Sequence, residues 1–178
     1  MAGEIRRLQP SIYAFVDGNH NGGVGIVIVV QRQDGRSIKE ISTTVWQVFA
    51  DAGLNMLASK AAITEALARI RNILGELAAL YGAIGEVDES SEVTIVHDYK
   101  GLDAWITGKW RINDPVVAEV VAACRKKIEA RGLQVKFLHQ PAHQSTFAIA
   151  DEFVKFNSIA DKLATRAAYP AEVRVRED

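Results

Sequence analysis

The chain has 178 residues, of which 48% are hydrophobic and 24% are charged, and its formal net charge is −1. This length and composition are those of an ordinary globular protein, and we expect one domain over residues 1–178, with a core from about 11 to 169 and short polar tails. A near-neutral charge excludes nucleic-acid binding through diffuse positive charge, so such binding would need a local basic patch or a bound metal. The single cysteine, Cys124, excludes an intramolecular disulfide framework. With no long apolar run and no leader pattern, we expect a cytoplasmic protein without a membrane segment.

The first third of the chain predicts three antiparallel strands. Residues 11–30 hold two β-branched and aromatic runs around a turn rich in Gly and Asn, which is typical of a hairpin. Asp34-Gly35 marks a second turn, and the run 37–50 predicts a third strand. Asp17 ends the first strand. A carboxylate there either caps the turn or lies buried with a compensating cation or hydrogen bonds.

The rest of the chain alternates helical and strand patterns. A long helix is predicted from about 58 to 81, with Lys60, Arg69, Arg71 and Glu76 away from its apolar face. A polar loop over 82–91 leads to a strand over 92–98 and a short helix over 102–106. Asp114-Pro115 opens a further helix that ends before Gly132. A strand over 133–139 and a helix over 157–168 close the domain.

The resulting order βββαβααβα predicts an α/β protein with a five-stranded mixed sheet, three antiparallel strands followed by two parallel ones, flanked by helices. Asp17 and Asp98 both end apolar strands, at the sheet edge where α/β proteins bind ligands. If these two strands are neighbours, the two carboxylates converge and repel each other unless a cation lies between them. Oxygen ligands without a Cys or His cluster suit Mg²⁺ or Mn²⁺, which typically handle phosphates.

Four motifs occur in an order that resembles type 1 ribonuclease H, and the middle one resembles its bacterial and viroplasmin-associated branch. They are Val16-Asp17-Gly18, the segment 98–110 with its Trp-Xaa-Thr-Gly-Xaa-Trp pattern, His143, and Asn157-Ser-Ile-Ala-Asp161. The resemblance covers about 11–169. It implies a ribonuclease H-like fold and an endonuclease that uses two Mg²⁺ ions (or Mn²⁺) to cut the RNA strand of RNA–DNA hybrids, leaving a 3′-hydroxyl and a 5′-phosphate. We expect a monomer.

The resemblance also implies the catalytic residues. Asp17, Asp98 and Asp161 match three of the family's four metal-binding acids, and Asp17 is assigned as the acid shared by both ions. His143 matches the family's loop histidine, which assists proton transfer or product release, and His139 is its rival.

The second acid of the family lies on the first long helix, and there the match is imperfect. The family's Asn-Xaa-Xaa-Glu spacing, applied from Asn55, falls on Ala58. We therefore assign the second catalytic and metal-binding acid to Glu65. The alternative is that Glu65 is a solvated helix residue paired with Arg69.

Nucleic-acid binding is expected in the hybrid's minor groove, where 2′-hydroxyls distinguish RNA from DNA. Trp105 is expected to belong to the core and Trp110 to the surface. The candidate nucleic-acid-binding residues are Gly18, Asn19, Asn55, Lys100, Lys109, Trp110, Arg111 and Asn157.

Two alternatives stay open at this point. The chain could be a catalytically impaired nucleic-acid-binding module that has lost the helix glutamate, or a nuclease of the same fold with another nucleic-acid substrate. The segment 144–156 is longer than the family's loop and contains Phe153 and Phe156. We expect 148–156 to extend the last helix or to form a short helix against the sheet.

Overall fold

The structure is a computed structural model that describes residues 4–141 and 150–178. Its strands are β1 (Ser11–Gly18), β2 (Gly23–Gln31), β3 (Arg36–Thr44), β4 (Glu92–His97), β5 (Gln134–His139) and β6 (Glu172–Glu177). Its helices are α1 (Val45–Phe49), a 3₁₀ turn η1 (Asn55–Leu57), α2 (Lys60–Ile70), α3 (Asn72–Glu86), α4 (Lys100–Ile106), α5 (Pro115–Ala130) and α6 (Glu152–Arg166). In the described residues no helix is both long and apolar enough to cross a membrane.

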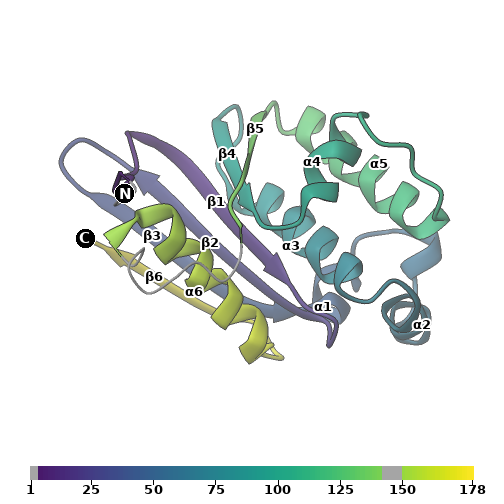
Figure 1. Cartoon of the computed structure of the whole chain (residues 1–178). Helices are drawn as coiled ribbons and strands as arrows, with labels where there is room; N and C mark the ends of the chain where they lie inside the picture. Colours follow the sequence, from purple (N-terminus) through teal and green to yellow (C-terminus); the bar gives the residue numbers. More distant parts are fainter. Residues whose placement is uncertain (1–3, 142–149) are drawn as a thin grey trace.

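The strands form one mixed sheet in the order β5-β4-β1-β2-β3-β6 (Figure 1). β1, β2 and β3 pair as an antiparallel meander, and β4 and β5 join in parallel beside β1, as the sequence predicted. The sheet has six strands and not the expected five, because residues 172–177 pair with β3 instead of forming a tail. All side chains of this edge strand are exposed, so it has no buried apolar face by which the sequence could have revealed it.

Helices cover the two faces of the sheet unequally (Figure 1). α3 packs on β1 and β2 from one face, with α1, α2 and α5 around it, and encloses the larger core. Of the described helices, only α6 packs on β1, β2 and β3 from the other face, over a smaller core that includes Phe15 and Phe156. The end of the sheet between α3 and α6 is therefore approached by helices from both sides.

The predicted long helix is two helices. Arg71 separates α2 from α3 with φ 54° and ψ −126°, a backbone conformation that L residues rarely adopt. α3 then continues to Glu86, so residues 82–86 are helical and not part of a loop. The third strand also ends earlier than expected, at Thr44, whose hydroxyl accepts from the Gln47 amide and caps α1.

The later elements follow the sequence closely. Asp114 caps α5 and Gly132 has a positive φ just past its end. α6 begins at Glu152, capped by Asp151, so the last helix includes 152–156 of the segment expected to be helical, whereas 148 and 149 lie outside the described residues. Phe153 and Phe156 on this extension pack in the smaller core.

Candidate active site

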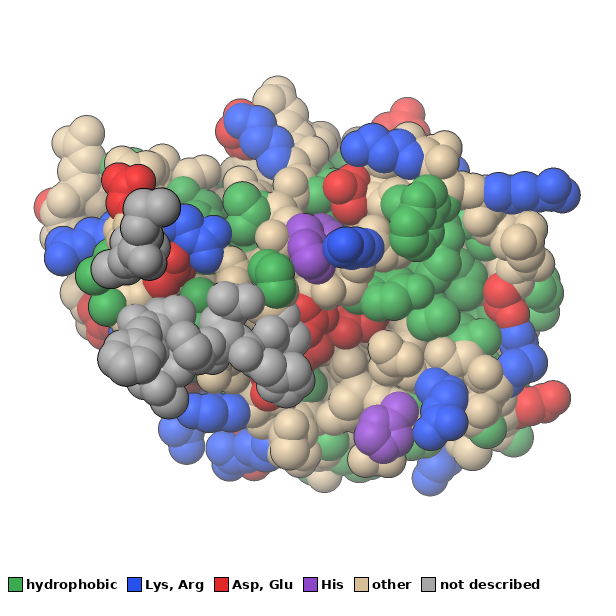
Figure 2. Space-filling model, in the orientation of Figure 1, with side chains coloured by type: hydrophobic (Ala, Val, Ile, Leu, Met, Phe, Trp, Pro, Cys, Tyr) green, Lys and Arg blue, Asp and Glu red, His purple; other side chains and the backbone are tan. Residues whose placement is uncertain are grey.

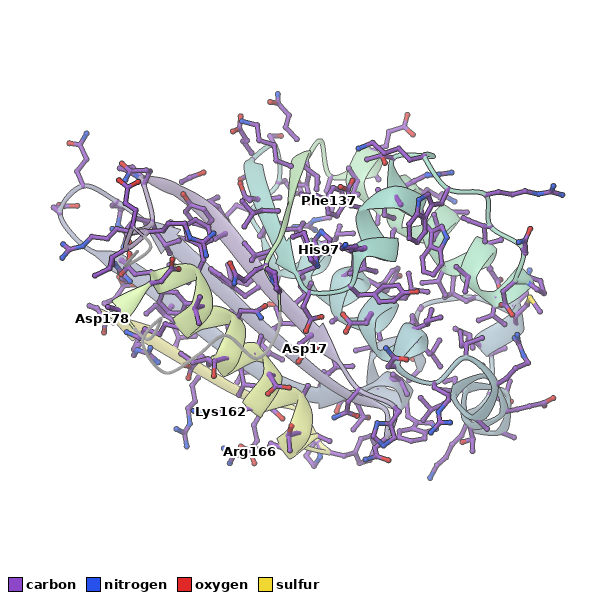
Figure 3. The ribbon with its side chains drawn as sticks, viewed as in Figure 1. Asp17, His97, Phe137, Lys162, Arg166 and Asp178 are labelled. Carbon is purple, nitrogen blue, oxygen red and sulfur yellow. The ribbon has the colours of Figure 1, made fainter. Side chains whose placement is uncertain are left out.

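Asp17 stands at the carboxyl end of β1 (Figure 3). The parallel pairing of β1 with β4 runs to Phe15 opposite Val96, so both strands end at the same edge of the sheet. Asp17 is 7% exposed, and the Gly18 amide donates to its Oδ1 at 2.9 Å. This carboxylate is thus buried at the edge where the sequence placed it.

Two glycines bring α3 onto the end of β1. A Cβ on Gly18 would lie 1.9 Å from the carbonyl carbon of Gly75, and a Cβ on Gly75 would lie 2.8 Å from the Asn19 nitrogen. Side chains at these positions would therefore separate the two backbones. Glu76, the next residue, is 3% exposed, and its Oε2 has no hydrogen-bond partner within the described chain.

Four carboxylates meet in one open pocket of about 490 Å³. Oxygens of Asp17, Glu76 and Asp98 all lie within 4.8 Å of one another. Asp161 reaches the same pocket from α6, on the opposite face of the sheet. Figure 2 shows acidic side chains in a hollow near the middle of this face of the molecule. We call Asp17, Glu76, Asp98 and Asp161 the acidic cluster.

The acidic cluster is electrostatically strained. Burial, then the charge of Asp98 and the contact with Asp161, raises the pKa of Asp17 to about 7. Burial, then the charges of Asp17 and Asp98, raises the pKa of Glu76 well above its usual range. Burial also raises the pKa of Asp98. Each shift reflects the cost of holding several negative charges together out of water.

The donor set fits a hard divalent cation. Among the ion pairs of residues 4–141 and 150–178, none involves a member of the acidic cluster. The unpartnered Glu76 oxygen and the crowded oxygens leave a place for positive charge. Carboxylates alone, without Cys or His, suit Mg²⁺ or Mn²⁺ better than Zn²⁺.

Glu65, the acid predicted from the sequence, does not join the cluster. It lies on the exposed side of α2, and Ala58 is exposed just before that helix. Its alternative partner Arg69 instead forms an ion pair with Asp114. The structure places Glu76 where Glu65 was expected.

The apolar residues keep the same spacing on both sides of the break at Arg71. The sequence pattern therefore revealed neither the break nor the burial of Glu76. Glu76 then counted as a solvent-facing residue in the middle of one long helix, whereas it lies near the start of α3. The available signal was the Gly75-Glu76 pair, a small residue beside an acid, as in Asp17-Gly18.

Three of the four histidines lie in the chain from the end of β4 onward. His143 lies outside the described residues. His139 ends β5, is exposed, and its Nε2 lies 3.0 Å from the carbonyl oxygen of Asp98. His97 is 1% exposed, and its Nδ1 lies 2.9 Å from the carbonyl oxygen of Tyr99. Burial lowers the pKa of His97.

The candidate nucleic-acid-binding residues fall into three groups. Gly18 and Asn19 line the pocket, although the Asn19 side chain already donates to the Ala164 carbonyl at 3.0 Å and accepts from two amides of its own turn. Asn157 is buried on α6, and its Oδ1 has no partner among the described residues. The others are exposed and do not line the pocket: Asn55, Lys100, Lys109, Trp110 and Arg111.

Of the three tryptophans, Trp105 and Trp110 divide between core and surface as predicted. Trp105 is half-buried against the larger core, and Trp110 is 51% exposed. Their rings meet edge to face with centroids 6.5 Å apart. Arg125 supports this segment by donating to the Trp105 carbonyl at 2.5 Å. Trp110 is thus an exposed aromatic held on a fixed backbone.

Comparison with known proteins agrees with this architecture. No protein-family model matches the chain, and no curated protein matches its sequence. Among solved structures, the LC11 ribonuclease H1, isolated from compost by a metagenomic approach, aligns with a TM-score of 0.51 and 20% identity over 91% of this chain and 98% of that one.

Two further structures align less closely. The same LC11 enzyme in complex with an RNA/DNA hybrid gives a TM-score of 0.49 at 19% identity, over 89% of this chain and 96% of that one. The ribonuclease H1 of the halophilic archaeon Halobacterium salinarum gives 0.47 at 16% identity, over 88% and 96%. With the sheet order and the helices on both faces, the first alignment shows that this chain has the ribonuclease H fold.

Proposed function

We propose that the protein is a type 1 ribonuclease H, a divalent-metal-dependent endonuclease that cuts the RNA strand of RNA–DNA hybrids. The observation that carries the proposal is the acidic cluster. It is assembled from β1, α3, α6 and the residue after β4, in an open pocket of a ribonuclease H fold. The motifs around Asp17, Asp98 and Asp161 support the same family.

Each acid has a distinct position in the proposed site. Asp17 is central, because Glu76, Asp98 and Asp161 all affect its pKa, and it is the acid best placed to serve as a shared ligand. Glu76 and Asp98 line the inner side of the pocket. Asp161 is exposed and holds the outer side, where substrate would approach. Two bound divalent ions would supply an activated water and stabilise the leaving 3′ oxygen.

The proposed substrate also needs a surface for the nucleic acid. Trp110 stands between Lys109 and Arg111, and all three side chains are exposed. An aromatic ring flanked by two cations suits contact with sugars and phosphates. Because the chain is nearly neutral overall, nucleic-acid binding would need a local basic patch or a bound metal, and this segment is such a patch.

The test is a cleavage assay on a labelled RNA–DNA hybrid, duplex RNA and duplex DNA, each with Mg²⁺ and with EDTA. We expect cleavage of the hybrid's RNA strand with Mg²⁺ and none with EDTA. Cleavage of another duplex in preference to the hybrid would favour the second nuclease alternative. Hybrid binding without any cleavage would favour the impaired module. That alternative arose because the sequence has no glutamate at the family's helix spacing, and Glu76 on α3 lies with Asp17 and Asp98.

A further inference from the structure

The backbone that carries Asp98 lies just beyond the sheet. β4 pairs with β1 as far as Val96 and with β5 as far as His97 opposite His139. α4 begins at Lys100. Asp98 is therefore the first residue past the paired part of β4, in a two-residue connection that the strand ladder does not hold.

Two imidazole rings hold this connection instead. His139 Nε2 lies 3.0 Å from the Asp98 carbonyl oxygen, and His97 Nδ1 lies 2.9 Å from that of Tyr99. A carbonyl oxygen only accepts hydrogen bonds, so both ring nitrogens must carry a proton and donate. The side chains of the last β4–β5 pair thus bind the carbonyls of the next two residues.

The two rings are themselves held in place. Their centroids are 5.8 Å apart, and the buried His97 ring meets Phe137 edge to face, also at 5.8 Å (Figure 3). The Gln140 amide donates to the His97 carbonyl at 2.7 Å and fixes the backbone next to His139. The two imidazole donors are therefore preorganised by contacts of their own rings and of the adjacent backbone.

Fixing this backbone matters because Asp98 is repelled by Asp17 and Glu76 whenever these carboxyl groups are ionised. Its carboxylate oxygen lies within 4.8 Å of oxygens of Asp17 and Glu76, and like charges at that distance push a free segment outward. A backbone fixed at the Asp98 carbonyl keeps the side chain directed into the pocket before any cation arrives.

We infer that His139, supported by His97, is a positioning residue that orients the Asp98 carboxylate for metal binding. The inference rests on the proposed function only in taking the acidic cluster as a metal site. Second-layer partners of metal ligands commonly change metal affinity 10–100-fold when removed. His139 is exposed, so replacing it leaves no cavity in the core.

The test compares His139→Gln with His139→Met. The Gln Nε2 can donate to the Asp98 carbonyl, whereas Met has a similar length and no donor. Gln134→Met, an exposed change at the other end of β5, is the matched control. The measurement is the Mn²⁺ dissociation constant by titration calorimetry without nucleic acid, together with the unfolding temperature.

We expect His139→Met to weaken Mn²⁺ binding about 10-fold or more. His139→Gln and Gln134→Met should stay near the wild-type value, and all three should unfold near the wild-type temperature. A Met variant with wild-type affinity, or a Gln variant as weak as the Met variant, would overturn the inference.

Metal-free crystal structures separate this inference from the proposed function. We expect the Asp98 carboxylate of His139→Met to turn away from Asp17 and Glu76, and an unmoved carboxylate would overturn the positioning role even if the wild type bound no metal. A wild type that binds Mn²⁺ but does not cut the hybrid would overturn the proposed function and leave the positioning role standing.

Discussion

The members of the acidic cluster differ in burial, and burial decides what each substitution should do. Asp17 and Glu76 are almost fully buried, Asp98 is half-buried and Asp161 is exposed. Removing a buried charge relieves repulsion within the protein, whereas removing the exposed charge changes chiefly what the pocket presents to a cation.

Asp17→Asn should abolish hybrid cleavage and weaken Mn²⁺ binding at least 100-fold, because the three other acids of the cluster all influence the pKa of Asp17. The fold should persist, since the amide has the same shape. Cleavage assays, calorimetry and circular dichroism check this. Near-normal cleavage by a folded variant would exclude the proposed shared-ligand role.

The raised pKa of Asp17 also predicts how stability depends on pH without metal. Between the ordinary value of 3.8 and about 7, the folded protein binds a proton that the unfolded chain has released. The contribution of Asp17 to stability is therefore present at pH 4, falls as the pH rises to about 7, and is then constant.

This fall is limited to about 4 kcal/mol, at about 1.4 kcal/mol per pH unit. Denaturant unfolding in EDTA, compared with Asp17→Asn at each pH, follows the titration of Asp17 together with that of Glu76, whose pKa the charge of Asp17 raises. The variant should become the more stable protein above pH 7, and added Mg²⁺ should restore the wild type. A difference that does not change with pH would contradict the raised pKa.

Glu76→Gln and Glu65→Gln form a matched pair on neighbouring helices. Glu76→Gln should weaken Mn²⁺ binding 10–100-fold and reduce cleavage strongly, because it removes a buried carboxylate of the cluster. Glu65→Gln should leave both within twofold, because Glu65 is exposed on α2. Equal effects of the two changes would mean that the helix acid is not Glu76.

At the scale of elements, close backbone contacts set where the helices lie on the sheet. α3 meets β1 through Gly18 and Gly75, and α6 meets β2 through Gly25, where a Cβ would lie 1.9 Å from the Ala160 carbonyl oxygen. These contacts bring Glu76 and Asp161, one from each face, to the end of β1. The site thus depends on small residues that have no chemistry of their own.

Gly75→Ala should destabilise the protein by about 1–3 kcal/mol and weaken Mn²⁺ binding, because the added methyl group forces α3 away from β1. Gly85→Ala in the same helix is the control. Its Cβ would meet only the flexible end of Lys127, and alanine favours a helix. Denaturant titration and calorimetry on both variants check this, and similar losses would show that the close approach is unimportant.

At the scale of the whole molecule, β6 completes the sheet without taking part in either core. The backbone amide and carbonyl of Arg36 both form hydrogen bonds with Asp178. Every second residue of β6 before Asp178 is therefore also in a hydrogen-bonded pair with β3, and Arg174 opposite Glu40 is one of them. The amides of Val173 and Val175 point to the free edge.

Arg174→Pro should therefore lower the unfolding free energy by about 1–3 kcal/mol, because it removes a ladder hydrogen bond. Val175→Pro should cost less than half as much. Both should bind Mn²⁺ like the wild type, since β6 does not line the pocket. Thermal unfolding and calorimetry measure these effects, and an equal cost for both changes would contradict the observed pairing.

The sequence by itself determined those features that depend on local pattern. Alternation and periodicity predicted the β1–β3 meander and the parallel β4 and β5. The Asp114-Pro115 pair predicted the start of α5, and the flanking Lys109 and Arg111 predicted the surface position of Trp110. Asp17 and Asp98 were found because each ends an apolar strand, and the parallel pairing of β1 with β4 in the structure brings those ends together. The motif around Asp161 placed the last acid on the final helix.

Only the tertiary structure decided the features that depend on contacts between distant segments. A continuous apolar repeat cannot reveal the break at Arg71, and Glu76 is buried only because Gly75 meets Gly18 across the fold. β6 exists because β3 offers it a backbone partner, although nothing buries its side chains. Local periodicity shows which side chains are buried, whereas the distance between two acids from different segments depends on how closely their two backbones approach.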